Sequence, residues 1–224
     1  GGVSAQNADA PRDKVPEARV LTDGERIPGI VHKGAVVASA YDGATWEVTA
    51  RPDSTVAPRS LDVVERSSGP PLVFVTTETG EMWRSTDRGE SFVPVGAGLP
   101  DDPVRAMSLG PDPVEGGDVI WATTDRNFVH HSHDLGDTWE PFSEGLTTDD
   151  QSTQGRVQAD WRAVAVLPNS GRVLLGGFDG MFLLDPGDDD WRVVETLDGY
   201  LAGLAVSPVY AYDGTLIVMS YSSG

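Results

Sequence analysis

Short apolar runs rich in β-branched residues alternate along most of the chain with turns of Gly, Pro and Asp. The clearest runs are Leu72–Thr77, Val119–Thr124, Val173–Gly177 and Thr215–Met219. Runs of this length between turn residues predict strands. We find no convincing 3.6-residue apolar period of the kind that predicts an amphipathic helix. The pattern therefore predicts an all-β chain.

Two of these runs begin a longer repeat. Residues 74–92 and 121–139 align without a gap and end in a turn of the form S-x-D-x-G-x-[ST]-[FW]. The turn residues are Ser85, Asp87, Gly89 and Phe92 in the first copy and Ser132, Asp134, Gly136 and Trp139 in the second. Weaker copies precede Trp46 and Trp191, so the closing aromatic residues are spaced by 46, 47 and 52 residues. Each period fits about four short strands, which predicts a β-propeller with about four to five four-stranded blades in this chain, and allows it to be part of a larger propeller.

The residue types of this turn have a structural explanation. An Asp carboxylate accepts backbone N–H bonds across a tight turn, and Gly adopts a positive φ without a Cβ clash. The closing aromatic side chain is expected to pack between neighbouring sheets. Because their carboxylates are used within the turns, we interpret Asp87 and Asp134 as structural residues.

These turns resemble the Asp-box repeat of bacterial neuraminidases, which also occurs in many propellers that are not enzymes. The resemblance covers about Ala35 to Ser222. The blade sequences are also similar to sortilin-like and photosystem-assembly-like propellers, in which the repeat is a scaffold for protein contacts. The resemblance implies a non-catalytic binding or assembly module with a protein or carbohydrate ligand.

A second resemblance implies an alternative function. Arg26-Ile27-Pro28 is similar to the Arg-Ile-Pro element that opens the first blade of sialidases. In sialidases this Arg belongs to a triad that binds the substrate carboxylate, a role suited to a rigid guanidinium fork. Arg26 is therefore the catalytic candidate of an exo-acting, sialidase-like glycoside hydrolase, or of a fragment of one. The remaining residues of such a site cannot be placed in the sequence, so the non-catalytic function is favoured over the enzyme.

The ends of the chain raise the question of ring closure. Residues 1–20 read as a flexible leader and residues 21–224 as the propeller domain. Within that domain, Leu201–Ser222 predicts only the inner two strands of a further blade. The N-terminal strands are expected to complete this blade; the alternatives are a larger propeller or a partner chain that pairs at the open half-blade.

The loops on the propeller face opposite the Asp-box turns are the expected binding surface. The longest blade-to-blade segment, Gly145–Asp160, is polar and leads into Trp161 and Arg162. Long loops in compact domains often carry function. The candidate binding residues are Arg126, Asp149, Gln154, Trp161 and Arg162.

Composition narrows the choice of partners. The chain has 35 acidic and 16 basic residues and a formal charge of −19, and its arginines are scattered, so nucleic acid is not expected as a partner. The absence of cysteine excludes disulfides and thiolate chemistry. No apolar run approaches the ~20 residues of a membrane span. An extracytoplasmic or secreted location is expected, with the cytoplasm of a halophile as the alternative.

Two clusters of titratable side chains are candidates for metal binding. His130, His131 and His133 lie close together, and on a strand His131 and His133 share a face from which they and Asp134 could bind zinc or nickel. Asp134, however, is assigned to its turn. The acidic run Asp185–Asp190 lacks the ligand spacing of a calcium motif. We therefore predict no metal and no cofactor.

Overall fold

The structure of the chain is a computed structural model that describes part of its length. Backbone and side chains are described for residues 52, 56–66, 68–126, 129–146, 160–178, 180–194, 200–207 and 209–221, and backbone alone for 17–20, 36–39 and 47–50. In these segments the chain forms seventeen strands and one four-residue helix, α1 (Tyr210–Asp213). No helix of the described segments has the length and apolar character needed to cross a membrane.

Three consecutive sheets each consist of four antiparallel strands. Their strands are β4 (Pro58–Val64), β5 (Leu72–Thr77), β6 (Met82–Ser85) and β7 (Val93–Val95); β8 (Val104–Pro111), β9 (Asp118–Thr124), β10 (Val129–Ser132) and β11 (Glu140–Pro141); and β12 (Ala163–Val166), β13 (Val173–Gly177), β14 (Gly180–Leu184) and β15 (Arg192–Val193). Within each sheet the strands are neighbours in chain order. Each sheet is therefore built from one continuous segment, which confirms the predicted four-stranded blades.

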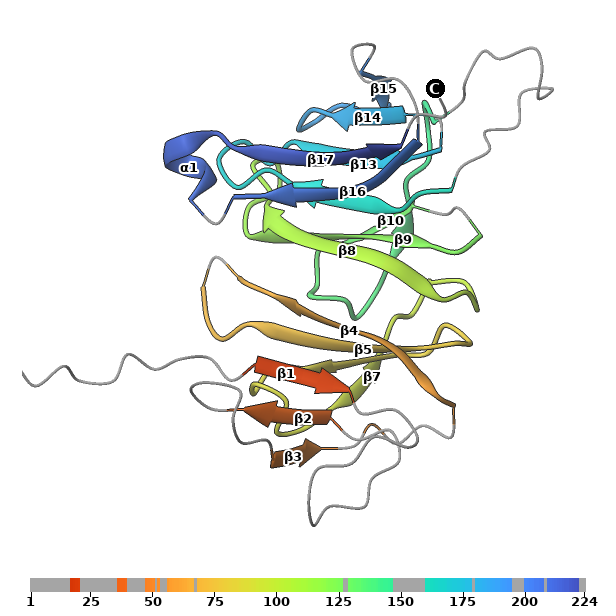
Figure 1. The fold of residues 1–224 in the computed structure, drawn as a ribbon, viewed down its shortest axis with the longest axis vertical. Helices are drawn as coiled ribbons and strands as arrows, with labels where there is room; N and C mark the ends of the chain where they lie inside the picture. The colour runs from red at the N-terminus through yellow and green to blue at the C-terminus, as the bar shows by residue number, and fades with distance from the viewer. Residues whose placement is uncertain are drawn as a thin grey trace, which may run out of the picture.

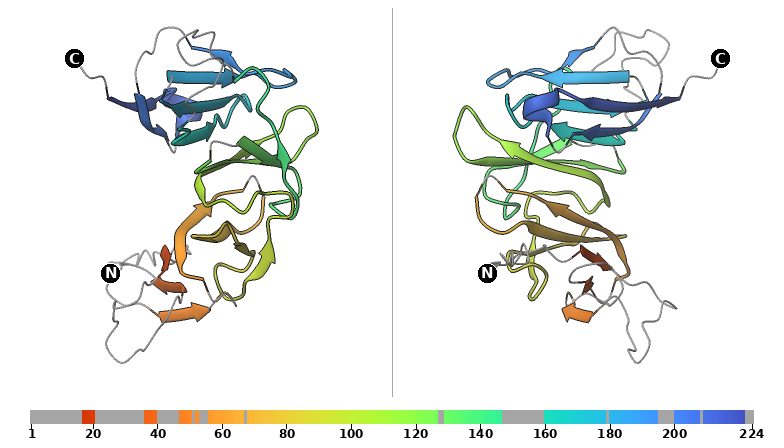
Figure 2. Two further views of the ribbon diagram at one scale, coloured as in Figure 1. Left: turned by 90° about the vertical axis from the view of Figure 1, so that its right-hand side faces the viewer. Right: turned by 60° about the vertical axis from the view of Figure 1, so that its left-hand side comes forward.

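Two smaller sheets lie at the ends of this series. The first has three strands, β1 (Glu17–Val20), β2 (Val36–Ser39) and β3 (Glu47–Ala50), and the last has two, β16 (Tyr200–Val206) and β17 (Leu216–Tyr221). The five sheets follow one another along a C-shaped arc (Figure 1, Figure 2). The first strand of each sheet contacts the first strand of the next, from β1 through β4, β8 and β12 to β16. This order places the first strands on the inner side of the arc.

The expectation that the N-terminal strands complete the last sheet is wrong. The β1–β3 sheet lies next to β4 at one end of the arc, whereas β16 and β17 lie at the other end (Figure 1). Only residues 51–57 connect β3 to β4, and seven residues span at most about 25 Å. This short connection keeps the first sheet beside the second. The two strands predicted for Leu201–Ser222 are present as β16 and β17, and β1 occupies the last four residues of the segment predicted as a leader.

The two turns of the repeat contain the same hydrogen bonds. Ser85 Oγ donates to Asp87 Oδ1 at 2.7 Å, and the N–H of Gly89 donates to Ser85 Oγ at 2.8 Å. The N–H of Ser91 donates to Asp87 Oδ1 at 2.9 Å. The second turn repeats these bonds. Ser132 Oγ donates to Asp134 Oδ1 at 2.9 Å, the N–H of Gly136 donates to Ser132 Oγ at 2.8 Å, and the N–H of Thr138 donates to Asp134 Oδ1 at 2.8 Å. In both turns one carboxylate therefore holds together the residues that link the third strand to the fourth.

Acidification is expected to weaken these turns. Partial burial acts to raise the pKa of Asp87, but hydrogen bonds from Ser91 and Ser85 lower it below its ordinary value of 3.8. For Asp134 burial again acts to raise the pKa, and hydrogen bonds from Thr138 and Ser132 lower it overall. A carboxylate whose pKa is lowered by folding contributes stability above its unfolded pKa, and this contribution is lost as the pH falls through the folded pKa.

We therefore expect the free energy of unfolding to decline below about pH 4, and to decline less in the double variant Asp87→Asn, Asp134→Asn. Urea unfolding between neutral and acidic pH measures the difference. Asp101→Asn, which changes an exposed carboxylate outside both turns, is the control. Equal pH dependence in the double variant and in the wild type would contradict this assignment.

The core lies between neighbouring sheets. Trp139, which closes the second turn, is 3% exposed and packs in one cluster with Phe74 and Met82 of the preceding sheet. Trp191 closes the turn of the next sheet and packs edge-on against Trp121, with ring centroids 5.5 Å apart. Each of these tryptophans therefore joins its own sheet to the preceding one.

The segment that follows the fourth strand of a sheet crosses the closing turn of the next sheet. The N–H of Trp139 donates to the carbonyl of Ala97 at 2.8 Å. Gly98 has a φ of +93°, and a Cβ at this position would lie 2.2 Å from the carbonyl oxygen of Trp139. A Cβ on Gly145 would likewise lie 2.5 Å from the carbonyl oxygen of Trp191. The repeated glycine is thus required by the close approach of two backbones.

The last sheet is covered on one face only. Leu216 and Val218 of β17 pack with Leu201 in a cluster that includes the third complete sheet. Ile217 and Met219 alternate with them and are 64% and 61% exposed. A partner chain at this half-blade, one of the alternatives to closure by the N-terminal strands, stays a prediction.

Candidate functional site

Charged side chains form a row on one face of the arc. In an antiparallel sheet the turn between the second and third strands lies at the opposite end from the turn between the third and fourth strands. The residues of the row lie on the turns between the second and third strands and at or just before the start of the first strand of each sheet. It therefore lies on the face opposite the two hydrogen-bonded turns.

Six residues of this row pair with one another across the three complete sheets. In order they are Glu78, Arg59, Asp125, Arg105, Asp160 and Arg162. Arg59 binds Glu78 at 3.2 Å and Asp125 at 2.8 Å, so it joins two sheets. Arg105 donates from Nε to Asp125 at 2.8 Å and also binds Asp160. Because the side chains are partly exposed, these pairs position the turns more than they stabilise the fold.

Arg162 lies at the end of the row, beside two aromatic rings. It donates to Asp160 from Nε at 2.8 Å and from a terminal nitrogen at 2.5 Å. Burial acts to raise the pKa of Asp160, but the hydrogen bond from Arg162 and the charge of Arg105 lower it overall. Asp160 is therefore held as the anion that fixes both guanidinium groups.

The aromatic rings extend this end of the row onto the last sheet. The guanidinium carbon of Arg162 lies 5.6 Å from the ring centroid of Tyr200. The Tyr200 ring lies 6.1 Å from that of Phe178, and Phe178 is 51% exposed. We call Arg105, Arg126, Arg162, Phe178 and Tyr200 the arginine–aromatic face.

The predicted binding residues have different positions. Arg126 and Arg162 lie on the arginine–aromatic face, with side chains 74% and 42% exposed. The N–H of Arg126 donates to Asp102 at 2.6 Å, which fixes its backbone. Trp161 is 1% exposed and packs edge-on against Phe182, so it anchors the start of β12 within the core and has almost no surface for a ligand.

Three further candidates lie outside the described residues. They are the binding candidates Asp149 and Gln154 and the catalytic candidate Arg26. Their positions relative to the arginine–aromatic face are therefore predictions of the sequence alone.

Sequence reasoning missed Phe178 and Tyr200. Phe178 directly follows β13, where an apolar residue reads as the end of a buried strand. The aligned position in the two preceding sheets carries a carboxylate, Glu78 or Asp125. An aromatic residue in place of an acid was therefore a signal, but nothing in the sequence indicated that Phe178 meets Tyr200 of the next sheet.

The histidines lie elsewhere, on the sheet β8–β11. The rings of His131 and His133 are 4.9 Å apart, whereas His130 is 4% exposed. Burial lowers the pKa of His131, and the neighbouring charge of His133 lowers it further. Asp134 remains within its own turn, so it does not join these rings.

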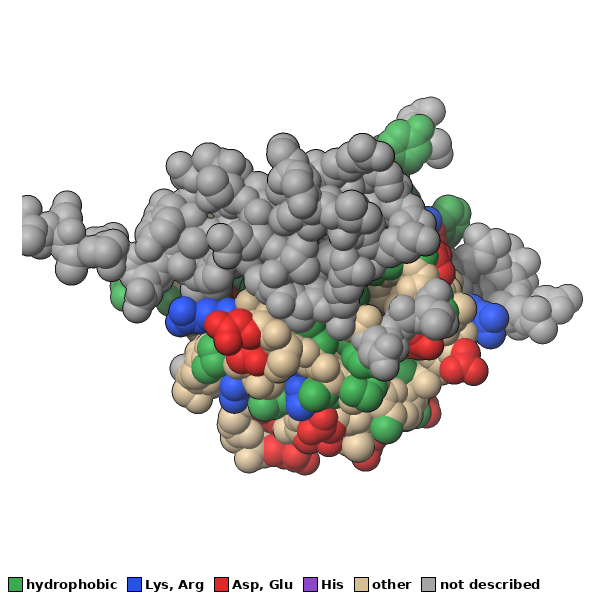
Figure 3. All heavy atoms as spheres, turned by 90° about the horizontal axis from the view of Figure 1, so that it is seen from below, with side chains coloured by type: hydrophobic (Ala, Val, Ile, Leu, Met, Phe, Trp, Pro, Cys, Tyr) green, Lys and Arg blue, Asp and Glu red, His purple; other side chains and the backbone are tan. Residues whose placement is uncertain are grey.

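The acidic run after β14 pairs with arginines. Asp185 binds Arg172 at 2.5 Å and also binds Arg192. Acidic and basic side chains also lie next to one another on the described surface at the β1–β3 end of the molecule (Figure 3). Asp185 is therefore held by two arginines, within a chain whose acidic residues outnumber its basic ones by 35 to 16.

Comparisons with known proteins identify the fold and no family. No protein-family model and no curated protein sequence matches the chain. Among solved structures, a β-propeller chain of the mitotic checkpoint complex matches 98% of this chain and 66% of its own length, with a TM-score of 0.53 and 14% identity.

Two structures of YCF48, one from Cyanidioschyzon merolae and one bound to D1 peptide, match 77% of this chain at 16% identity and a TM-score of 0.48. The chain spans about half the length of these YCF48 chains, 53% and 51%. Taken with the four-stranded sheets, the match to the checkpoint-complex chain establishes an all-β fold that corresponds to several blades of a β-propeller.

Proposed function

We propose that the chain is a non-catalytic protein-binding module that contacts its partner through the arginine–aromatic face. This proposal rests on the group formed by the exposed Arg162 and Phe178 and the half-buried Tyr200 between them. Arg and aromatic residues are enriched at protein interfaces, and Arg and Tyr are among the residue types that contribute most of the binding energy there.

The ion pairs support this face in two ways. They link Arg162 through Asp160 to Arg105, so the guanidinium group is held in place before a partner binds. Pre-ordered side chains lose less entropy on association. The pairs also balance the charge of this face within a chain of formal charge −19, which reduces the repulsion of an acidic partner.

The two hydrogen-bonded turns fit the same proposal. We interpret them as Asp-box turns with a structural role, since their carboxylates are engaged by Ser85 and Ser132. A protein ligand is favoured over carbohydrate because the exposed rings lie beside paired charges, with few free amide or carboxylate groups among the described residues of this face. Glycan binding is the alternative that the test must distinguish.

Selection from a phage-displayed library of random peptides on the immobilised full chain tests the proposal. We expect enriched peptides that bind the wild type and lose at least about tenfold in affinity with Arg162→Ala or Phe178→Ser, the size of a hot-spot contact. Val193→Ser is the matched control, because Val193 is an equally exposed apolar residue (48%) on the outer strand of the same sheet.

Melting temperatures of all variants show whether a loss of binding reflects misfolding. If the enriched peptides bind the double variant Arg162→Ala, Phe178→Ser as tightly as they bind the wild type, the face is assigned wrongly. Binding on a glycan array without any peptide enrichment would replace the protein ligand with a carbohydrate.

A further inference from the structure

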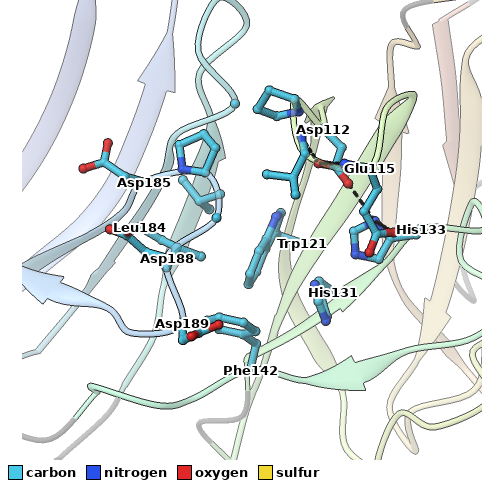
Figure 4. A pocket seen from close by; sticks show the side chains of 16 residues that line it. Asp112, Glu115, Trp121, His131, His133, Phe142, Leu184, Asp185, Asp188 and Asp189 are labelled. Atoms are coloured by element: carbon cyan, nitrogen blue, oxygen red, sulfur yellow. Dashed lines mark hydrogen bonds and ion pairs between the residues drawn. The ribbon is translucent and has the colours of Figure 1, made fainter.

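A cavity of about 310 Å³ lies between the sheets β8–β11 and β12–β15. It opens on the face that carries the two hydrogen-bonded turns, opposite the arginine–aromatic face. One wall carries Asp112, Glu115 and His133, and the other is the turn Asp185–Asp189, with the Trp121 ring between them (Figure 4). The described residues that line it include five carboxylates and no lysine or arginine.

Three potential ligand atoms converge on the first wall. His133 Nδ1 lies 3.0 Å from Asp112 Oδ2 and 3.6 Å from Glu115 Oε2. One nitrogen and two carboxylate oxygens from these residues all lie within 4.8 Å of one another. Ligand atoms about 2.0–2.2 Å from a tetrahedral Zn²⁺ are separated by about 3.3–3.6 Å. The two separations from His133, 3.0 and 3.6 Å, are close to those of a metal site with three protein ligands.

The fold positions these ligands from two hairpins. Asp112 follows β8, and its Oδ1 accepts the N–H groups of Val114 and Glu115 at 2.9 and 3.1 Å. These bonds fix the carboxylate and direct Oδ2 toward His133, which follows β10 (Figure 4). Both hairpins belong to one sheet, so the three ligands are held by a single rigid element.

Asp112 Oδ2 lacks a normal hydrogen-bond partner. The Asp112 side chain is 7% exposed, and this buried oxygen has no hydrogen bond of acceptable geometry despite its closeness to His133. A buried carboxylate oxygen that accepts no hydrogen bond is costly. Glu115 adds a second negative charge beside it, so the arrangement favours a cation.

A second buried polar group belongs to a residue that lines the same cavity. Trp121 is 4% exposed, lines the cavity, and its indole Nε1 has no hydrogen-bond partner. An indole N–H can only donate, so it requires an acceptor such as water or the oxygen of an anion. A metal ion with three protein ligands binds such an acceptor at its open position.

We propose that Asp112, Glu115 and His133 form a binding site for a divalent transition-metal ion, and that this ion is Zn²⁺. One imidazole and two carboxylates are ligands that Zn²⁺ accepts. The remaining coordination position faces the cavity, where water or a small oxyanion binds within reach of the Trp121 wall. The site is independent of the arginine–aromatic face.

Calorimetric titration of Zn²⁺ into the full chain, stripped with a chelator, tests the site. We expect one Zn²⁺ per chain in the wild type, and affinity weaker by at least about tenfold in His133→Ala and in Glu115→Gln. Glu115 is 65% exposed, so its replacement by Gln is compatible with an intact fold. Glu140→Gln, which changes a carboxylate 3.9 Å from His131, is the matched control and should bind as the wild type does.

Substitution with Co²⁺ supplies a readout that is independent of affinity. A visible ligand-field spectrum that is lost in His133→Ala supports direct coordination by this imidazole. The proposal is overturned if Zn²⁺ does not bind, or if binding is unchanged in both His133→Ala and Glu115→Gln. Loss of binding in His131→Ala but not in His133→Ala would also overturn it.

Discussion

Trp139→Ala is expected to lower the free energy of unfolding by about 3–5 kcal/mol, the usual cost of removing a large buried aromatic side chain. Trp139 is 3% exposed and belongs to the cluster that joins the sheet β8–β11 to Phe74 and Met82 of the preceding sheet. Its indole N–H also donates to the carbonyl of Gly136 at 3.0 Å. The substitution therefore leaves a cavity between two sheets and removes one of the two hydrogen bonds that the Gly136 carbonyl accepts.

Phe92→Ala is the matched control, because Phe92 closes the equivalent turn of the preceding sheet but is only half-buried. Chemical denaturation of both variants gives the comparison. Equal losses in the two variants would mean that the closing position, rather than burial between sheets, determines the cost.

Gly98→Ala is expected to have the second largest effect, about 2–4 kcal/mol, from overpacking together with a positive φ. The added methyl group would lie 2.2 Å from the carbonyl oxygen of Trp139, and this oxygen belongs to the backbone and cannot rotate away. Relief requires the segment after β7 to move off the next sheet. The hydrogen bond between Trp139 and Ala97 is then expected to lengthen.

Gly116→Ala separates the two contributions to this effect. Gly116 has a similar φ of +83°, but a Cβ there would meet nothing within 4 Å. It should cost only about 1–2 kcal/mol, the penalty of the left-handed conformation. Thermal and urea unfolding measure both variants. Similar losses in Gly98→Ala and Gly116→Ala would remove the steric explanation.

The sequence predicted the blades well because their signals are local. A turn such as Ser132–Trp139 depends on residues close in the chain, so its spacing could be read directly. The position of the β1–β3 sheet could not be read in this way, since it depends on which sheet lies beside which. The short connection between Ala50 and Pro58 was the one available indication.

The candidate sites were less predictable because they join residues of different sheets. Arg126 and Arg162 were selected from loop position, but the ion pairs that link Arg162 through Asp160 and Arg105 to Asp125 span two sheets. The histidines were recognised as a cluster, yet the carboxylates beside His133 come from another hairpin. Asp134, the acid nearest in sequence, is engaged in its turn.

The placement of the apolar clusters determines how local unfolding spreads through the molecule. Each cluster lies between two consecutive sheets, and in the part of the chain that the structure describes the first strand of each sheet contacts the first strand of the next. An arrangement of this kind behaves as a linear array with nearest-neighbour coupling. Fraying that starts at β17 can stop at the next interface, whereas the sheet β8–β11, which is packed on both sides, opens only when two interfaces fail.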